Sequence, residues 1–167
     1  MKRLRVLLLV VLALPASPSM AGDADFLAAF AGNWSGKGKF RMTTRSSPVT
    51  VSCAFEANAS QTTLSLDGRC RGMVVISRRI GVMLEATEAG FSGSYVGSTT
   101  GPAALAGIRS ENAFRLSIRW AKTVNGDRQA EMRVEKTGDD QMRIITLDGD
   151  PASGESVVTS EIALDRS

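Results

Sequence analysis

The sequence predicts an all-β protein: an antiparallel up-and-down barrel of eight to ten strands, preceded by one short helix. Short runs in which apolar and polar residues alternate recur along most of the chain. Turn-forming residues separate consecutive runs, which is typical of hairpins. Helical periodicity is confined to one segment near the N-terminus. A closed barrel leaves no exposed strand edge, and a two-sheet β-sandwich is the alternative fold.

The first 21 residues show the three parts of an export signal. Lys2, Arg3 and Arg5 form a basic start, an apolar run covers 6–14, and Ser19-Met20-Ala21 supplies small residues before the cut. The apolar run is shorter than the roughly 20 residues that span a bilayer. We therefore expect a signal peptide over 1–21, cleaved after Ala21, and a single domain over 22–167 in the periplasm or outside the cell.

Removal of that segment changes the charge balance. The whole chain has 20 Lys and Arg against 17 Asp and Glu, a net charge of +3. The excess is the three bases of the signal, so the mature domain is neutral and its composition does not favour nucleic-acid binding. No second long apolar run occurs, so we expect no transmembrane segment after cleavage.

The predicted helix covers 26–30, with Asp23 or Asp25 as its cap and Gly32 at its end. The first strand, over 34–42, follows. Its even positions are predicted to point inward: Trp34, Gly36, Gly38, Phe40 and Met42. Its odd positions are polar and predicted to point outward: Ser35, Lys37, Lys39 and Arg41. Glycine on an inner face indicates a sharply bent strand or the close approach of another backbone.

The next two strands, over 49–57 and 63–72, are predicted to form a hairpin around 58–61. In the register that follows, Cys53 lies opposite Cys70. The same register opposes two further pairs: Phe55 with Gly68, and Ala57 with Leu66. A cysteine pair in an exported protein favours a disulfide, so register and chemistry agree.

Seven more strands complete the barrel. Alternating runs predict them over 73–86, 91–97, 104–108, 114–120, 130–134 and 142–147, with a last strand over 157–164. Between 120 and 130 we expect a loop longer than two residues, with Gly126 at positive φ, so that Trp120 opposes Ala130 and Ile118 opposes Met132. The connection 148–154 is polar and is expected to be exposed.

The segment Gly32-Asn33-Trp34-Ser35-Gly36-Lys37-Gly38 resembles the Gly-x-Trp start of lipocalin-like (calycin) barrels. It is also similar to the Gly-x-Trp-x-Gly-x-Gly start of nitrobindin-like haem-binding barrels. The resemblance implies a calycin fold in which Trp34 packs across the closed end. Haem binding of the nitrobindin kind is not implied, because that iron is held by a histidine and this chain has none.

The absence of histidine also excludes Ser-His-Asp and Cys-His catalysis and the usual zinc sites. Carboxylates are paired in sequence in three places: Asp139 with Asp140, Asp148 with Asp150, and Glu131 with Glu135. All are expected in loops or on outward strand positions, where acids are solvated. We therefore predict no catalytic residue, no metal and no cofactor, and a protein that is not an enzyme.

Two binding functions remain. The first is a barrel that holds a small apolar ligand such as a lipid, with glycines on the inner face leaving room for it. Its candidate residues are Trp34, Gly36, Gly38, Phe40, Phe91, Tyr95, Phe114, Leu116, Ile118, Trp120 and Met132. The second is an envelope protein-interaction module, such as an assembly factor, an accessory to a sensor, or an inhibitor. Its candidate docking patch comprises Lys37, Lys39, Arg41, Arg69, Arg71, Arg78 and Arg79.

Overall fold

The computed structural model describes residues 21–72 and 76–167, so the predicted signal peptide lies almost entirely outside the described residues, as does the start of the strand predicted from 73. The described chain forms one helix, α1 (Ala21–Ala28), and ten strands. The strands are β1 (Gly32–Phe40), β2 (Val49–Ala59), β3 (Thr63–Gly72), β4 (Ile76–Thr87), β5 (Gly90–Val96), β6 (Ala103–Ser110), β7 (Ala113–Val124), β8 (Asp127–Gly138), β9 (Gln141–Gly149) and β10 (Ser156–Arg166).

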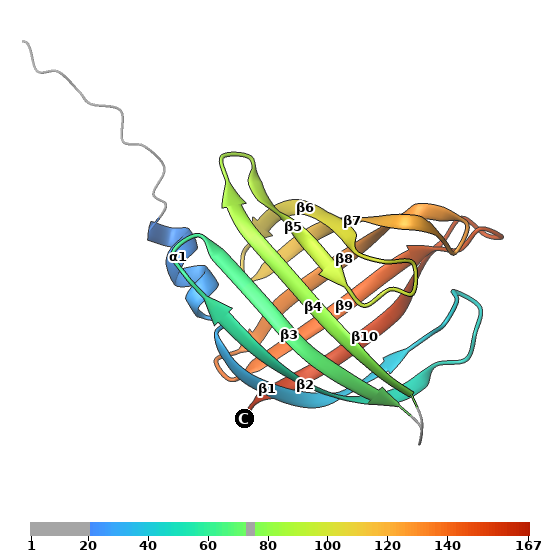
Figure 1. Cartoon of the computed structure of the whole chain (residues 1–167), viewed down its shortest axis with the longest axis horizontal. Helices are drawn as coiled ribbons and strands as arrows, with labels where there is room; N and C mark the ends of the chain where they lie inside the picture. Colours follow the sequence, from blue (N-terminus) through green and yellow to red (C-terminus); the bar gives the residue numbers. More distant parts are fainter. Residues whose placement is uncertain (1–20, 73–75) are drawn as a thin grey trace, which may run out of the picture.

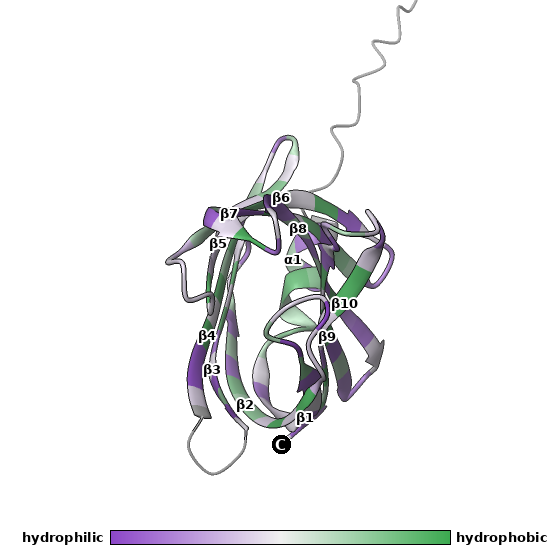
Figure 2. Ribbon diagram, turned by 90° about the vertical axis from the view of Figure 1, so that its right-hand side faces the viewer, coloured by the Kyte–Doolittle hydropathy of each residue, from purple (hydrophilic) through white to green (hydrophobic). Residues whose placement is uncertain are grey.

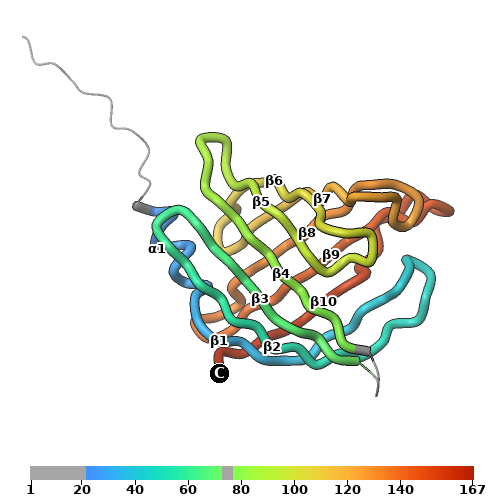
Figure 3. Tube along the Cα trace, in the orientation of Figure 1, coloured from blue at the N-terminus to red at the C-terminus, as the bar shows by residue number. Residues whose placement is uncertain are grey.

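All ten strands join in one closed antiparallel barrel (Figures 1 and 3). Each strand pairs with the next along the chain, and β1 closes the ring against β10, with Trp34 opposite Arg166 and Phe40 opposite Ser160. The predicted up-and-down barrel is confirmed, and the sandwich alternative is wrong. Closure pairs the strand edges that a sandwich would leave exposed.

The predicted hairpin of β2 and β3 has the expected register. Cys53 lies opposite Cys70, and the two form a disulfide with their Cα atoms 4.1 Å apart. Both cysteines are buried on the inner face. The bridge therefore lies inside the barrel and fixes the pairing of two neighbouring strands.

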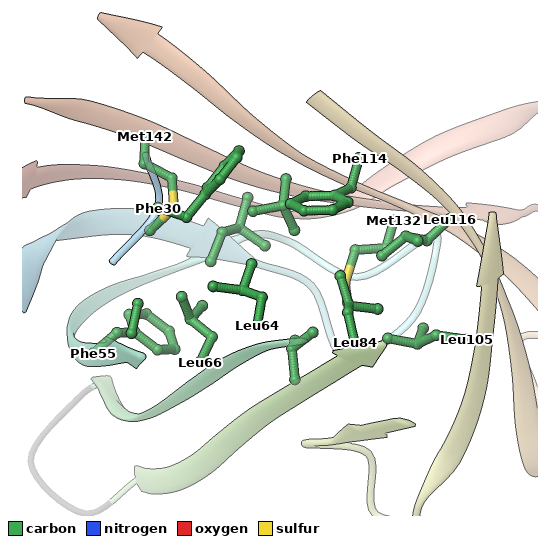
Figure 4. Close-up of a cluster of buried hydrophobic side chains, with 14 of the residues drawn as sticks. Phe30, Phe55, Leu64, Leu66, Leu84, Leu105, Phe114, Leu116, Met132 and Met142 are labelled. Carbon is green, nitrogen blue, oxygen red and sulfur yellow. The ribbon is translucent and has the colours of Figure 1, made fainter. Parts of the chain in front are cut away.

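Inward side chains fill one half of the barrel with a dense apolar core. Figure 4 shows Phe30, Leu64, Leu84, Phe114 and Met142 meeting there, each fully or almost fully buried. Burial of one such side chain stabilises the fold by roughly 1.5–3 kcal/mol. The alternation of apolar and polar bands along the strands is visible in Figure 2. The core thus stabilises the half of the barrel that lies next to α1.

Helix α1 closes this end of the barrel. Phe26 and Phe30 pack against Phe114 with ring centroids 4.7 and 5.0 Å apart. Figure 2 looks into the barrel from the opposite end, and the apolar ribbon of α1 is visible behind the ring of strands. The helix begins earlier than predicted, at Ala21, and the chain turns into β1 at Gly32, where φ is +127°.

Trp34 packs at this closed end, as the calycin resemblance implies. Its ring is 1% exposed and lies between two cations, Lys136 at 4.4 Å and Arg166 at 4.3 Å from the ring centroid. Arg166 also donates hydrogen bonds to the carbonyl oxygens of Ala29 and Ala31, just after the helix. Burial, and then the neighbouring Arg166, lower the pKa of Lys136. These contacts join the last strand to the helix.

Glycines on the inner face do not leave room, which corrects the expectation from the sequence. A Cβ on Gly36 would overlap the carbonyl oxygen of Ala163, and one on Gly38 would overlap that of Glu161. Gly68 and Gly93 are enclosed in the same way by β2 and β4. The alternative reading of these glycines, close approach of another backbone, is the one that the structure shows.

Two further expectations are wrong. Met42 is not inside but 71% exposed, because β1 ends at Phe40 and the chain leaves the barrel there. Asn125 and Gly126 form a two-residue turn with φ values of 51° and 103°, so the predicted positive φ of Gly126 is confirmed but the longer loop is not. A bulge after Arg119 then changes the register, and Ala130 lies opposite Ile118, not Trp120.

Candidate functional site: a cavity at the open end of the barrel

A cavity of about 210 Å³ lies at the end of the barrel opposite α1. The strands that form it contribute their ends at that side: the last residues of β1, β3, β5, β7 and β9, and the first of β2, β4 and β10. Its main apolar lining residues are Phe40, Val49, Val51, Cys70, Ile80, Tyr95, Trp120, Val124 and Ile162. Polar side chains join the lining from Arg41, Arg78, Thr146, Asp148, Thr159 and Ser160.

Two aromatic rings form part of the apolar wall. Tyr95 on β5 and Trp120 on β7 meet edge to face, with ring centroids 5.9 Å apart. Both sit on inward positions near the ends of their strands, so their rings project into the cavity mouth rather than into the dense core. Burial raises the pKa of the Tyr95 hydroxyl to about 12, so the phenol is uncharged at neutral pH.

Asp148 is a buried acid in the cavity wall, and the sequence prediction for it is wrong. β9 extends to Gly149, which places Asp148 on the inner face in line with Met142, Ile144 and Thr146. Asp148 is only 4% exposed. The hydroxyl of Thr159 on β10 donates a hydrogen bond to Oδ2 of Asp148. Oδ1 of Asp148 has no hydrogen-bond partner among the described residues.

Trp120 supplies a second buried polar atom without a partner. The residue is 5% exposed, and its indole Nε1 has no acceptor within the described part of the chain. Its backbone is held by Arg128, whose Nε donates to the carbonyl oxygen of Trp120 at 2.9 Å. Two residues of the same cavity wall therefore carry an unpaired buried acceptor and an unpaired buried donor, a situation that is rare for buried polar groups.

Two loops border the mouth. Thr44, between β1 and β2, donates to Oδ1 of Asp150, beyond β9, at 2.7 Å. This hydrogen bond, more than any other contact, lowers the pKa of Asp150. Asp150, like Asp148, is buried, which corrects the expectation at these two positions, whereas 149 and 151–154 are exposed as expected. The bond joins the two loops beside the cavity.

The candidate ligand residues predicted from the sequence lie in different parts of the barrel. Phe40, Tyr95 and Trp120 line the cavity together. Phe91, Phe114, Leu116, Ile118 and Met132 are buried in the barrel and do not line it, and Trp34 lies at the closed end. Gly36 and Gly38 are packed against β10. Sequence reasoning missed Asp148, Thr159 and the aliphatic residues Val51, Ile80 and Ile162 as wall residues.

The candidate docking patch is also divided. Lys37, Lys39, Arg69 and Arg71 are exposed on the outer face of β1 and β3. Arg79 is paired with Asp67 at 2.6 Å. Arg78 turns to the cavity mouth and donates to the carbonyl oxygen of Gly97 at 2.9 Å, while Arg41 lines the same mouth and bonds Ser46. Only four of the seven residues are therefore exposed on the outer face without an acidic partner among the described residues.

Across the described residues, no group of three or more Asp, Glu or Cys side chains is arranged to hold a metal ion. Within the same residues, no helix has both the length and the apolar character required to cross a membrane.

A closed antiparallel barrel with a helix and a buried tryptophan at one end and a cavity at the other is the architecture that the calycin resemblance of the sequence implies. The S-type phycobiliprotein lyase CPES from Guillardia theta has a similar structure, with a TM-score of 0.55 and 10% sequence identity over 90% of this chain and 98% of that chain. At this identity the likeness establishes a shared fold alone. The structure of EF1p2_mFAP2b bound to DFHBI covers 89% of this chain and 100% of its own at a TM-score of 0.45 and 13% identity. No family model matches the sequence, and no curated protein matches it.

Proposed function

We propose that this protein is an exported, non-enzymatic binding barrel that holds a small, largely apolar ligand in the cavity opposite α1. The observation that carries the proposal is the cavity itself, about 210 Å³ in volume and walled by aromatic and aliphatic side chains. Concave, mostly apolar sites with a few placed polar groups are the usual form of small-molecule sites.

The volume sets the size of the ligand. An engineered apolar cavity of about 150 Å³ in another protein binds benzene, and typical ligand pockets measure about 300–1,000 Å³. A cavity of about 210 Å³ therefore suits a single substituted ring or one end of a lipid chain, and not a whole long chain.

Binding without chemistry is favoured over catalysis. Asp148 is the single acid among the cavity-lining residues, and its sequence neighbour Asp150 is engaged by Thr44 and Ser153 outside that lining. Paired carboxylates, which many hydrolytic mechanisms use, are not found together in the lining. The Thr159 hydroxyl and the Asp148 carboxylate are bonded there, and we assign this bond to holding the neighbouring strands β9 and β10. The lyase name of the similar structure is not carried over to this chain.

The interaction module remains a second hypothesis with less support. Lys37, Lys39, Arg69 and Arg71 give an exposed basic surface, yet exposed charges commonly do no more than solvate a strand face. The cavity is the more specific feature, because two of its lining residues, Trp120 and Asp148, carry unpaired buried polar atoms.

A matched pair of variants tests the proposal. Ile80 lies in the cavity wall, whereas Ile108 is 56% exposed on β6. We expect toluene or 1-hexanol to bind the wild-type protein in calorimetry. Ile80→Phe should weaken binding at least about tenfold by filling the cavity, and Ile108→Phe should leave it unchanged. Absence of binding to the wild type, or equal binding by Ile80→Phe, contradicts the proposal.

Export is tested separately. The protein is expressed with its full N-terminus in a bacterial host, and the mature form is recovered from the periplasm. N-terminal sequencing should read Gly22 as the first residue. Recovery of the intact chain in the cytoplasm would contradict this part of the proposal while leaving the cavity proposal in place.

A further inference from the structure

Two buried polar atoms, each on a residue that lines the cavity, have no hydrogen-bond partner among the described residues. Oδ1 of Asp148 is an acceptor and Nε1 of Trp120 is a donor, and neither is bonded within the described part of the chain. Leaving a buried group unpaired costs about 1–3 kcal/mol, and more when the group is charged. Both atoms belong to residues that line the same cavity. A ligand that pairs both would recover this free energy.

Both groups are held in place before any ligand arrives. The Thr159 hydroxyl occupies Oδ2 of Asp148, and thereby fixes the orientation in which Oδ1 is left free. Trp120 is fixed by its edge-to-face contact with Tyr95 and by the bond from Arg128 to its backbone. Fixed groups lose little conformational entropy on binding, so each hydrogen bond to a ligand contributes more fully to affinity.

The charges around the cavity select against an ionic ligand. Arg41 and Arg78 line it together with Asp148, and the phenol of Tyr95 is uncharged. The lining holds two guanidinium groups against one carboxylate, so the balance of charge disfavours a cation. An anion such as a carboxylate offers acceptors alone and cannot pair Oδ1 of Asp148, which is itself an acceptor. A neutral molecule with both a donor and an acceptor satisfies the unpaired atoms without adding a charge to a buried site.

We propose that the ligand is an uncharged, ring-sized molecule that carries an N–H donor for Oδ1 of Asp148 and an acceptor for Nε1 of Trp120, such as a primary amide or a lactam. The inference rests on the proposed function, because it assigns the chemistry of the ligand in the same cavity. It replaces a purely apolar ligand with one that is polar at one edge.

Four probes of similar size separate the alternatives: benzamide, toluene, benzylammonium and benzoate. We expect benzamide to bind the wild-type protein about tenfold more tightly than the other three in calorimetry, the gain that a hydrogen bond to a charged group provides. Asp148→Asn should lose this preference while binding toluene as before. The control is Asp165→Asn, which changes an exposed acid near the C-terminal end of β10. This variant should behave as the wild type.

Indole ¹⁵N resonances give a second readout. The protein has two tryptophans, and Trp34 already donates its Nε1–H to the carbonyl oxygen of Phe30. Benzamide should shift the Trp120 indole signal and leave that of Trp34 in place, which also verifies that the fold persists. Trp120→Phe keeps an aromatic ring but removes the N–H, and should lose the preference for benzamide while still binding toluene.

The outcomes distinguish the two levels of the proposal. If toluene binds as tightly as benzamide, the unpaired atoms are served by water and the inference is overturned, while the apolar binding function stands. If benzylammonium binds best, the charge argument is wrong. If no probe binds, the inference and the proposed function fail together.

Discussion

The indole N–H of Trp34 donates a buried hydrogen bond of 2.8 Å to the carbonyl oxygen of Phe30. This single bond connects the chain just after α1 to the start of β1. Phe30 is fully buried, so its carbonyl oxygen has no access to water if the donor is removed. The closed end therefore depends on an aromatic residue that also has an N–H group.

Replacement of Trp34 by Phe should lower the free energy of unfolding by about 2–4 kcal/mol, because a buried carbonyl is orphaned and packing volume is lost. The matched change Trp120→Phe should cost less, since Nε1 of Trp120 has no partner among the described residues to lose. Chemical denaturation followed by circular dichroism compares the two. Equal losses would contradict the role assigned to the bond.

The Cys53–Cys70 disulfide should stabilise the protein by about 3 kcal/mol, the value for a loop of its 17-residue separation in the chain-entropy model. The double variant Cys53→Ala, Cys70→Ala removes the bridge without leaving a free thiol. Urea denaturation of the two proteins, with and without reductant, gives the difference. Reductant should destabilise the wild type and have no effect on the variant.

Gly36→Ala should destabilise the barrel by roughly 1–3 kcal/mol or more, because the added methyl group meets the backbone of β10, which cannot move without opening the β1–β10 pairing. Gly149→Ala is the control, since the nearest atom to its added Cβ is 3.9 Å away. Thermal unfolding should show a lower Tm for the first variant and little change for the second.

Tyr95 is the only tyrosine, so its titration can be followed directly by tyrosinate absorbance. Burial raises the pKa of its phenol to about 12, against about 10 in an unfolded chain. The contribution of Tyr95 to the free energy of unfolding is therefore fully present below pH 10 and is lost as the pH rises towards 12. Over that range the unfolded state has released a proton that the folded state retains.

Tyr95→Phe should remove this part of the pH dependence and leave the contribution of the lysines and arginines. The wild type should therefore lose more stability than the variant between about pH 10 and 12, by up to roughly 2–3 kcal/mol. A phenol that titrates near pH 10 in the folded protein would show that Tyr95 is open to water.

Much of the barrel could be predicted because period-two alternation is strong where one strand face is buried. The Cys53–Cys70 register followed from two independent constraints, pattern and disulfide chemistry. The register of β7 against β8 could not be predicted in this way, because the bulge after Arg119 leaves no sign in the alternation of apolar and polar residues. The Asn125-Gly126 pair indicated a turn and the positive φ of Gly126, but the expected longer loop was wrong, because the bulge and not the loop accommodates the change of register.

The cavity was harder to predict than the barrel. Asp148-Gly149-Asp150 has the composition of a loop, and this composition outweighed a weaker signal: Asp148 continues the inward parity of Ile144 and Thr146. Alternation alone cannot tell whether an inward residue fills the core or lines a void. Trp120 and Phe114 lie on the same face of one strand, yet only Trp120 reaches the cavity.

The pairing of β1 with β10 has a consequence for how the molecule is made. These strands stand at the two ends of the described fold, so the ring can be completed only after the last strand has been synthesised. Until then the edge of β1 is available to wrong partners, and contacts between such distant segments form slowly. Loss of the last four residues would remove Leu164 and Arg166 from the seam and leave four of its seven residue pairs, those of 37–40 with 160–163.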